Sequence, residues 1–536
     1  MSRSASELLL YGGAQAPLGG WRVIAVEGRH RRRFLQSQLT SDLEALAPGA
    51  SQPTALLDRA GRLQAFGFVL ARDERFELLL PDAVSESAVE LLESHVISDD
   101  VSFRVLDTPR MRLVLGAEAV RLLPEIPPED RFPIQAWASR GFVAWREVEI
   151  DLPVLEEPEL ETLRVLSGLP SWGVDAGPGT PVHETTLVRT AVSFDKGCYL
   201  GQETVAKVAS GRGAARAPML LEVADRELPG PDELVGRPFA VGSREKAGEI
   251  LGRVDWEGAS YLHTALYRDL RVEGLELQCR FGDDSTLAAR VRGLPLIETP
   301  LPDEWARKLE LRAVEEFAHD REESAMRLLG RAIAVSPSYA DAYESLGVVL
   351  GRHKRFDEAI ELMKRLLEVD PLSVMAHTNL SLYYNQLGRI DDAEREAAEA
   401  MRAGMRLKNQ ERDRSSAEDR ASGVAAEDRK RRAEMFRQVL ELDPEDALGN
   451  FGLGELMVEE GRFADAVEHL ERALASDPRY SAAILALGRA HEGAGDLGLA
   501  RETYRRGVEI AAAKGDLATA NKMQESLVGL DDAGSV

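Results

Sequence analysis

The chain has 536 residues, too many for one hydrophobic core, and this length predicts about three or four domains. Its formal net charge of −25 argues against direct nucleic-acid binding by phosphate neutralisation, and no stretch approaches the ~20 apolar residues that span a bilayer. The two cysteines and the absence of a signal-peptide pattern predict a cytoplasmic protein.

The first 293 residues alternate between strand-like and helix-like patterns. The runs RFELLLP (75–81) and MRLVLG (111–116) favour β-strands, whereas SESAVELLESHV (85–96) has the spacing of an amphipathic helix. This mixture predicts an α+β module in the first half of the chain.

The stretch SFDKGCYLGQETVAK (193–207) raises the main chemical question, because it contains Cys198. The pattern predicts a helix that begins at or just after this thiol and stops at Gly211. A helix amino terminus and the nearby Lys196 both favour a thiolate, so Cys198 is either a working thiol or a buried, inert residue. Cys279, in the strand-like LELQCRF (275–281), is expected to be inert.

KGCYLGQE (196–203) resembles the signature of the YgfZ family of folate-binding proteins, which are relatives of the glycine-cleavage T-protein. LLDRAGRLQAFGFVL (56–70) and LRVLSGLPSWGVD (163–175) resemble further segments of that family. The resemblance implies a T-protein-like module of ferredoxin-like lobes (1–216) followed by a small β-barrel (217–293). It also implies that tetrahydrofolate binds at a central opening between the three lobes.

The resemblance further implies roles for particular residues. Cys198 would be the reactive thiol, with Lys196 as its electrostatic support. The residues expected at the cofactor site are Arg164, Tyr199, Gly201, Gln202 and Glu203, although Gln202 and Glu203 also suit the first turn of an ordinary helix. No Cys or His lies beside Cys198 at ligand spacing. We therefore expect no stably bound metal or cluster, and Cys198 is at most one ligand of a cluster shared with a partner.

Two departures from the family pattern bear on activity. The T-protein pattern has a catalytic aspartate where this chain has Gln64 and Ala65, and neither residue can ionise to assist aminomethyl transfer. Leu166 stands where relatives commonly have glutamate, and its side chain cannot hydrogen-bond a pterin. These departures argue against aminomethyltransferase activity and leave tetrahydrofolate binding open.

Beyond a proline-rich linker (294–304), the sequence becomes almost entirely helical. It repeats with a period of 34 residues, which separates Pro337 from Pro371 and Pro444 from Pro478. Each of these prolines ends a segment that resembles a tetratricopeptide repeat (TPR).

The repeats predict an all-α TPR superhelix of about five units over residues 305–536. Glycines on the first helix of a unit, such as Gly347, would let the two helices approach closely. A polar insert near 405–432 breaks the period and is either a projecting helix or a disordered segment.

TPR arrays bind protein segments along a concave groove and rarely catalyse reactions. Some members hold the carboxyl terminus of a partner with Lys and Asn side chains of successive first helices. The corresponding positions here include Glu344, Val348, Thr378 and Leu382, so this clamp is not evident. The sequence predicts a protein partner in the groove without naming it.

Three hypotheses for function follow. The first is a folate-binding-type helper in the assembly or repair of iron–sulfur enzymes, including those that modify tRNA, in which the TPR groove recruits a client or assembly protein. The second is a tetrahydrofolate-dependent aminomethyltransferase. The third is a scaffold in which only the repeats act and the folate-type module is a relic.

Overall fold

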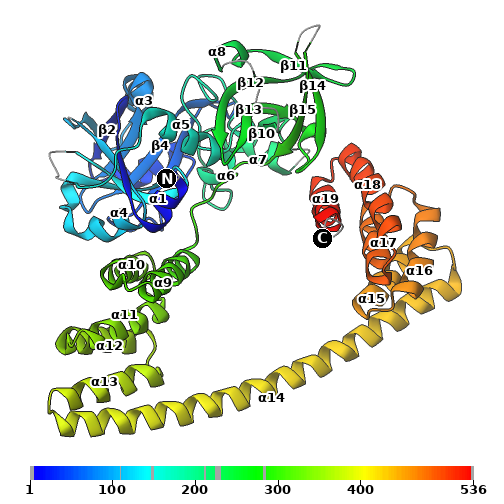
Figure 1. The fold of residues 1–536 in the computed structure, drawn as a ribbon. Coiled ribbons are helices and arrows are strands. Elements are labelled where there is room, and N and C mark those ends of the chain that lie inside the picture. The colour runs from blue at the N-terminus through cyan, green and yellow to red at the C-terminus, as the bar shows by residue number, and fades with distance from the viewer. Residues whose placement is uncertain are drawn as a thin grey trace. The chain divides into compact units, whose positions relative to one another are not determined.

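Figure 1 shows the computed structural model, which describes residues 5–108, 110–145, 150–210, 213–223, 228, 231–281 and 285–532. Internal packing divides the chain into two units, the first formed by residues 1–211 and 294–412 and the second by residues 212–293 and 413–536. Each unit therefore combines part of the α+β region with part of the helical array.

The first unit contains a five-stranded antiparallel sheet with the order β3-β4-β5-β2-β6. Helices α2 (Arg31–Gln38) and α3 (Asp82–Ser94) contribute side chains such as Leu35 and Leu92 to its core. The expected strand at 75–81 and helix at 85–96 are confirmed as β5 and α3. The strands are β2 (Trp21–Glu27), β3 (Ser51–Leu57), β4 (Leu63–Ala71), β5 (Phe76–Pro81) and β6 (Ser102–Val105).

A second antiparallel sheet of the first unit has the order β1-β7-β9-β8. Its core includes Val114 and Phe142 of the strands and Ala119 of a covering helix. The expected strand within 111–116 is confirmed as β7. The elements are α1 (Ala5–Tyr11), β1 (Ala14–Pro17), β7 (Arg112–Leu115), α4 (Ala117–Leu122), β8 (Arg131–Ala136) and β9 (Ser139–Ala144). Three helices follow this sheet in the chain, namely α5 (Glu157–Leu166), α6 (Leu187–Thr190) and α7 (Gln202–Ser210).

The second unit begins with a closed six-stranded barrel, β10-β13-β12-β11-β14-β15. Phe239, Leu262 and Val291 lie in its core together with Cys279, which is fully buried as expected. The predicted α+β class and the small barrel are thus confirmed, whereas a central opening between the three lobes stays a prediction. The elements are β10 (Arg216–Val223), α8 (Pro231–Leu234), β11 (Pro238–Val241), β12 (Arg244–Trp256), β13 (Ala259–Tyr267), β14 (Glu276–Phe281) and β15 (Ser285–Arg292).

The helical array confirms the predicted TPR pattern of antiparallel helix pairs. In the first unit, α9 (Pro302–Ala318) and α10 (Glu322–Val335) pack against the second sheet's helices. Trp305, only 1% exposed, donates its indole N–H to Leu10 O over 2.7 Å. Arg331 forms an ion pair with Glu118 and donates to Tyr11 O over 2.7 Å. Both helices of the first repeat are therefore held to α1 and α4 by partly buried contacts.

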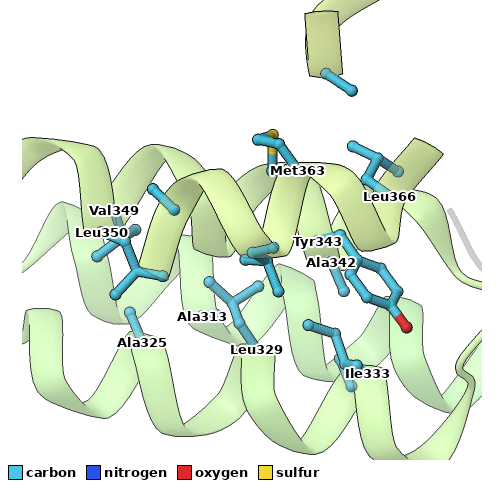
Figure 2. Close-up of a cluster of buried hydrophobic side chains, with 14 of the residues drawn as sticks. Ala313, Ala325, Leu329, Ile333, Ala342, Tyr343, Val349, Leu350, Met363 and Leu366 are labelled. Atoms are coloured by element: carbon cyan, nitrogen blue, oxygen red, sulfur yellow. The ribbon is translucent and has the colours of Figure 1, made fainter. Parts of the chain in front are cut away.

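Glycines let the helices of a repeat pack closely, as the sequence predicts. A Cβ added to Gly347 of α11 (Ala340–Arg352) would lie 2.3 Å from Met363 Cε of α12 (Phe356–Val369). Figure 2 shows Met363 and Tyr343 within the hydrophobic core that these helices share with Leu329 of α10.

The array continues with α13 (Val374–Gln386) and α14 (Ile390–Leu442), a helix of 53 residues. The polar insert at 405–432 lies within α14, so the structure gives the helical alternative of the two that the sequence left open. The chain ends in the second unit with α15 (Ala447–Glu459), α16 (Phe463–Ser476), α17 (Ser481–Ala494), α18 (Leu497–Lys514) and α19 (Leu517–Asp532). There Val272 of the barrel joins the hydrophobic cluster around Tyr504 and Met523.

Candidate functional site

The loop that carries Cys198 differs from its predicted structure. Helix α7 begins at Gln202, four residues after the thiol, because a turn closed by Gln202 N–H to Tyr199 O precedes it. Gly201 occupies this turn with φ of +84°, and a Cβ there would lie 2.5 Å from Asp58 O. Glycine is therefore the residue that this turn requires. The predicted stop at Gly211 lies outside the described residues.

Lys196 anchors the loop from one side. Its side chain is 7% exposed, and Nζ donates to Gln36 O at 2.6 Å, Leu39 O at 2.8 Å and Ser41 O at 2.8 Å. These carbonyls lie at and just beyond the carboxyl end of α2, where the helix dipole favours a cation. Burial lowers the pKa of Lys196 to about 8, against the opposing influence of Asp42 and Glu44.

The hydrogen bonds of Lys196 bear on its expected role as support for the Cys198 thiolate. An ammonium group has three N–H donors, and all three of these are directed to backbone carbonyls. The geometry therefore makes Lys196 a positioning residue for the loop, with no donor left over for the thiol.

Tyr199 anchors the loop from the other side. Its side chain is 6% exposed and packs with Phe66, Leu187 and Val205, and burial raises its pKa. Its ring lies 5.3 Å from Lys196 Nζ, at cation–π distance. Cys198, between these two anchors, is exposed. The loop thus exposes a free thiol at the surface, while Lys196 and Tyr199 on either side of it are buried.

Gln202 and Glu203 have the ordinary helix-start roles that the sequence also allowed. Gln202 Nε2 donates to Lys196 O over 3.4 Å, which ties the helix start back to the loop. Glu203 forms an ion pair with Lys207 on the exposed surface of α7, at 2.5 Å.

A cavity of about 270 Å³ lies elsewhere in the first unit. Its walls come from β3 and β4, the β8–β9 turn, the segment after α5, helix α6 and the segment after the barrel. The lining includes Phe66, Gln135, Trp137, Leu169, Leu187 and Glu298. Phe66 and Leu187 also belong to the core around Tyr199, so the cavity and the Cys198 loop share part of one wall.

The β8–β9 turn brings a strained backbone to this cavity. Trp137 and Ala138 have φ of +51° and +56°, a conformation that usually requires Gly or Asn, and such strain costs about 1–3 kcal/mol per residue. Trp137 is 4% exposed, and its indole N–H has no hydrogen-bond partner among the described residues. The sequence pattern does not point to this residue, because the segment lacks the Asn-Gly signal of a tight turn.

None of the five residues predicted at the cofactor site lines this cavity. Arg164 contacts the lining indirectly, because its Nη1 donates to Leu169 O at 2.6 Å and Leu169 is part of the lining. Its guanidinium also pairs with Glu161 and with the buried Asp175, and although burial alone would lower the pKa of Arg164, these two carboxylates raise it. Arg164 therefore supports the cavity wall from behind.

The two departures noted in the sequence lie in buried or locally bonded positions. Ala65 and Leu166 are buried, and Gln64 Nε2 donates to the neighbouring Leu63 O. Among the residues that the structure describes, no three His, Cys, Asp or Glu side chains are grouped to hold a metal ion. No helix within the described ranges is long and apolar enough to cross a membrane.

Comparisons with known proteins cover both halves of the chain. An uncharacterized protein of Haemophilus influenzae is 28% identical over 279 residues, which cover 51% of this chain and 94% of that protein. The tRNA-modifying protein YgfZ of Edwardsiella ictaluri is 27% identical over 305 residues, 52% of this chain and 91% of that protein. Both match the length of the α+β region.

The helical array has relatives of its own. Residues 311–368, 345–406 and 457–520 match tetratricopeptide repeat families. The TPR repeat-containing protein PA0015 of Pseudomonas aeruginosa is 38% identical over 100 residues, 19% of this chain and 95% of that protein. The N-terminal half of the chain thus has YgfZ proteins among its homologues, and its C-terminal half carries tetratricopeptide repeats.

Proposed function

We propose that this protein is a tetrahydrofolate-binding accessory factor that assists the assembly or repair of iron–sulfur proteins, with Cys198 as its reactive group. The observation that carries the proposal is the exposed thiol on a loop that the buried Lys196 and Tyr199 anchor from both sides. Phe66 and Leu187 pack with Tyr199 and also line the cavity, so the loop and the cavity are neighbours. The relative named a tRNA-modifying protein makes iron–sulfur enzymes that act on tRNA the first clients to test.

The residues of the cavity fit a pterin ring. The cavity volume lies just below the about 300–1,000 Å³ typical of ligand pockets. Phe66 and Trp137 supply aromatic surface for a flat ring, and the Trp137 indole supplies a donor that has no partner among the described residues. The Glu298 carboxylate supplies an acceptor for ring N–H groups. Tetrahydrofolate, when bound, carries one-carbon units, and these residues would bind and orient it.

The thiol limits what the protein can do with an iron–sulfur cluster. A cluster normally takes four thiolate-type ligands, and this chain has one exposed cysteine. We infer that Cys198 acts on a client's cluster or cysteine as a single ligand or nucleophile. The other ligands would come from the client, which the TPR array would recruit.

The folate part of the proposal is tested by titrating tetrahydrofolate into the full chain and measuring heat and thermal stabilisation. Glu298→Gln should weaken binding about tenfold, because it removes a charged acceptor from the cavity. The matched control is Glu245→Gln, which alters an exposed carboxylate of the barrel. Absence of heat and of stabilisation with the wild-type chain would support a scaffold in which only the repeats act.

The thiol part is tested in cells that lack the chain. We expect Cys198→Ala to leave the activity of an iron–sulfur enzyme unrestored, whereas Cys279→Ala restores it because that residue lies in the barrel core. Full restoration by Cys198→Ala would remove the thiol from the mechanism. Aminomethyl transfer remains the weaker alternative, and formation of methylenetetrahydrofolate from an aminomethyl donor by the purified chain would favour it.

A further inference from the structure

Three stacked helices of the first unit carry an exposed row of apolar side chains. Helices α9, α11 and α13 are the first helices of successive repeats, and α11 contacts both of the others. Val314, Val348 and Leu382 follow one another at intervals of 34 residues and therefore occupy the same position in each repeat. They are 55%, 40% and 51% exposed. We call these three residues the apolar ladder.

An acidic group lies one helical turn before the ladder. The equivalent residues there are Glu310, Glu344 and Thr378, which share a helix face with the ladder. Glu310 accepts hydrogen bonds from Tyr339 Oη at 2.7 Å and Ser345 Oγ at 3.0 Å, so its carboxylate already has partners within the array.

Glu344 differs from its counterpart in the preceding repeat. Among the described residues it has no hydrogen bond and no ion pair, and Asp341, one turn earlier and exposed, likewise lacks a cation. Burial and the neighbouring charges of Asp341 and Glu310 raise the pKa of Glu344. Arg307 of α9 occupies the repeat position equivalent to Asp341. Its charge acts to lower the pKa values of Tyr339 and Glu304. The middle of the face is therefore negative, and no cation of the described residues pairs with Glu344 or Asp341 there.

We propose that this face of α9, α11 and α13 binds a cationic amphipathic segment of a partner protein. Apolar side chains of the segment would cover the apolar ladder, and a Lys or Arg would pair with Glu344 and Asp341. This inference rests on the recruiting role proposed for the array and specifies its partner. An acidic carboxyl terminus, the ligand of Lys- and Asn-based clamps, would be repelled here.

A second copy of the chain fits the face less well. The net charge of −25 makes two copies repel each other. The basic cluster at 29–33 is engaged within its own chain, since Arg31 donates to Asp73 O, Arg32 donates to Leu43 O, and Arg29 and Arg33 pair with Asp100 and Asp99. Charge complementarity therefore favours a separate basic partner.

The test uses the full chain and fluorescent synthetic helices of Leu and Lys, with a twin in which Glu replaces Lys and another in which Ser replaces Leu. Fluorescence anisotropy gives Kd for each. We expect the Leu–Lys peptide to bind about tenfold more tightly than either twin, because both apolar contact and opposite charge are needed. Equal binding of the Leu–Glu twin would overturn the proposal.

Variants decide whether binding occurs at this face, since a net charge of −25 attracts any cationic peptide to some extent. Val348→Gln should weaken binding of the Leu–Lys peptide about tenfold, and Glu344→Gln about fivefold with a smaller dependence on salt. Ile97→Gln, at an apolar residue that is 93% exposed in the first sheet's domain, is the control and should change nothing.

Unchanged binding by Val348→Gln and Glu344→Gln would overturn the assignment of the face. Concentration-dependent dimerisation that Val348→Gln abolishes would overturn it in favour of a second copy. All measurements are made without tetrahydrofolate. A failure here would leave the tetrahydrofolate heat and the Cys198 phenotype unaffected, and a failure of those tests would leave peptide binding intact.

Discussion

The loop at 196–203 is held by contacts that each occur once, whereas the helical repeats are held by one contact that recurs along the array. In the loop each contact occurs once: Lys196 binds three carbonyls, Tyr199 fills a core, and Gly201 makes a turn. In the repeats one contact recurs, because an added Cβ at Gly347, Gly454 or Gly488 would strike Met363, Leu470 or Tyr504 respectively, always 16 residues later. A loop of this kind is identified by its individual residues, and an array by its period.

The difference has a consequence for substitutions. A change in the loop removes a contact that no other residue duplicates and alters how Cys198 is presented. A change in a repeat damages one unit and leaves its neighbours packed. The following predictions test this contrast, beginning with the largest effect.

The largest effect concerns the two cysteines. Cys198 is exposed on the loop, whereas burial raises the pKa of Cys279 to about 12. A maleimide should therefore label Cys198 at least about a thousandfold faster than Cys279 from pH 7 to 9, a range in which the buried thiol forms almost no thiolate. Mass spectrometry of digested, labelled protein measures both rates.

Denaturant should make both thiols reactive, and Cys198→Ala should abolish the fast phase. A native protein that takes up label at both positions at similar rates would show that the barrel core opens readily. Failure of Cys198 to react would contradict the exposed loop on which the proposed function depends.

Gly201→Ala should cause the largest loss of local stability. Its φ is positive and the new Cβ would meet the backbone oxygen of Asp58, which cannot move aside, so we expect a cost of about 3 kcal/mol. Gly197→Ala is the matched control, because a Cβ at Gly197 meets nothing within 4 Å. Hydrogen exchange of the amides of α7 measures both, and equal protection in the two variants would show that the turn is not under this constraint.

The sequence could locate the loop and the repeats, because both are encoded by residues close together in the chain. The motif KGCYLGQE identified the thiol, and the 34-residue period identified the helix pairs. It could not give the partners of Lys196, since the carbonyls of Gln36, Leu39 and Ser41 lie more than 150 residues earlier. The start of α7 differs from the predicted one because Gly201 forms a turn with positive φ, which the motif alone does not reveal.

The cavity was beyond sequence patterns for a related reason. Its lining comes from six separate segments, and only folding brings Phe66, Trp137 and Glu298 together. The family resemblance led to Arg164, which supports this wall through Leu169 O and does not line it. Backbone strain at Trp137 becomes visible only when φ is known.

Lys196→Met should destabilise the loop by about 2–3 kcal/mol, because it leaves three carbonyls at its base without their donor. Lys207→Met is the control, since this lysine pairs with Glu203 on the exposed surface and its loss should leave the protection of the loop unchanged. Hydrogen exchange at residues 193–207 and the labelling rate of Cys198 report the effect. Equal destabilisation by the two variants would mean that the buried contacts do not fix the loop.

The smallest effect is expected in the array. Gly488→Ala places a Cβ 2.1 Å from Cε1 of Tyr504, a ring that is fully buried, and should cost about 2 kcal/mol through overpacking. Gly498→Ala, in the first turn of α18, meets nothing within 4 Å and should instead stabilise that helix by about 0.5–1 kcal/mol through its higher helix propensity. Hydrogen exchange should show the loss in α17 and α18 of Gly488→Ala while the loop at 196–203 keeps its protection. If the loop loses protection as well, the array and the thiol loop unfold together, and the contrast between single and repeated contacts does not hold.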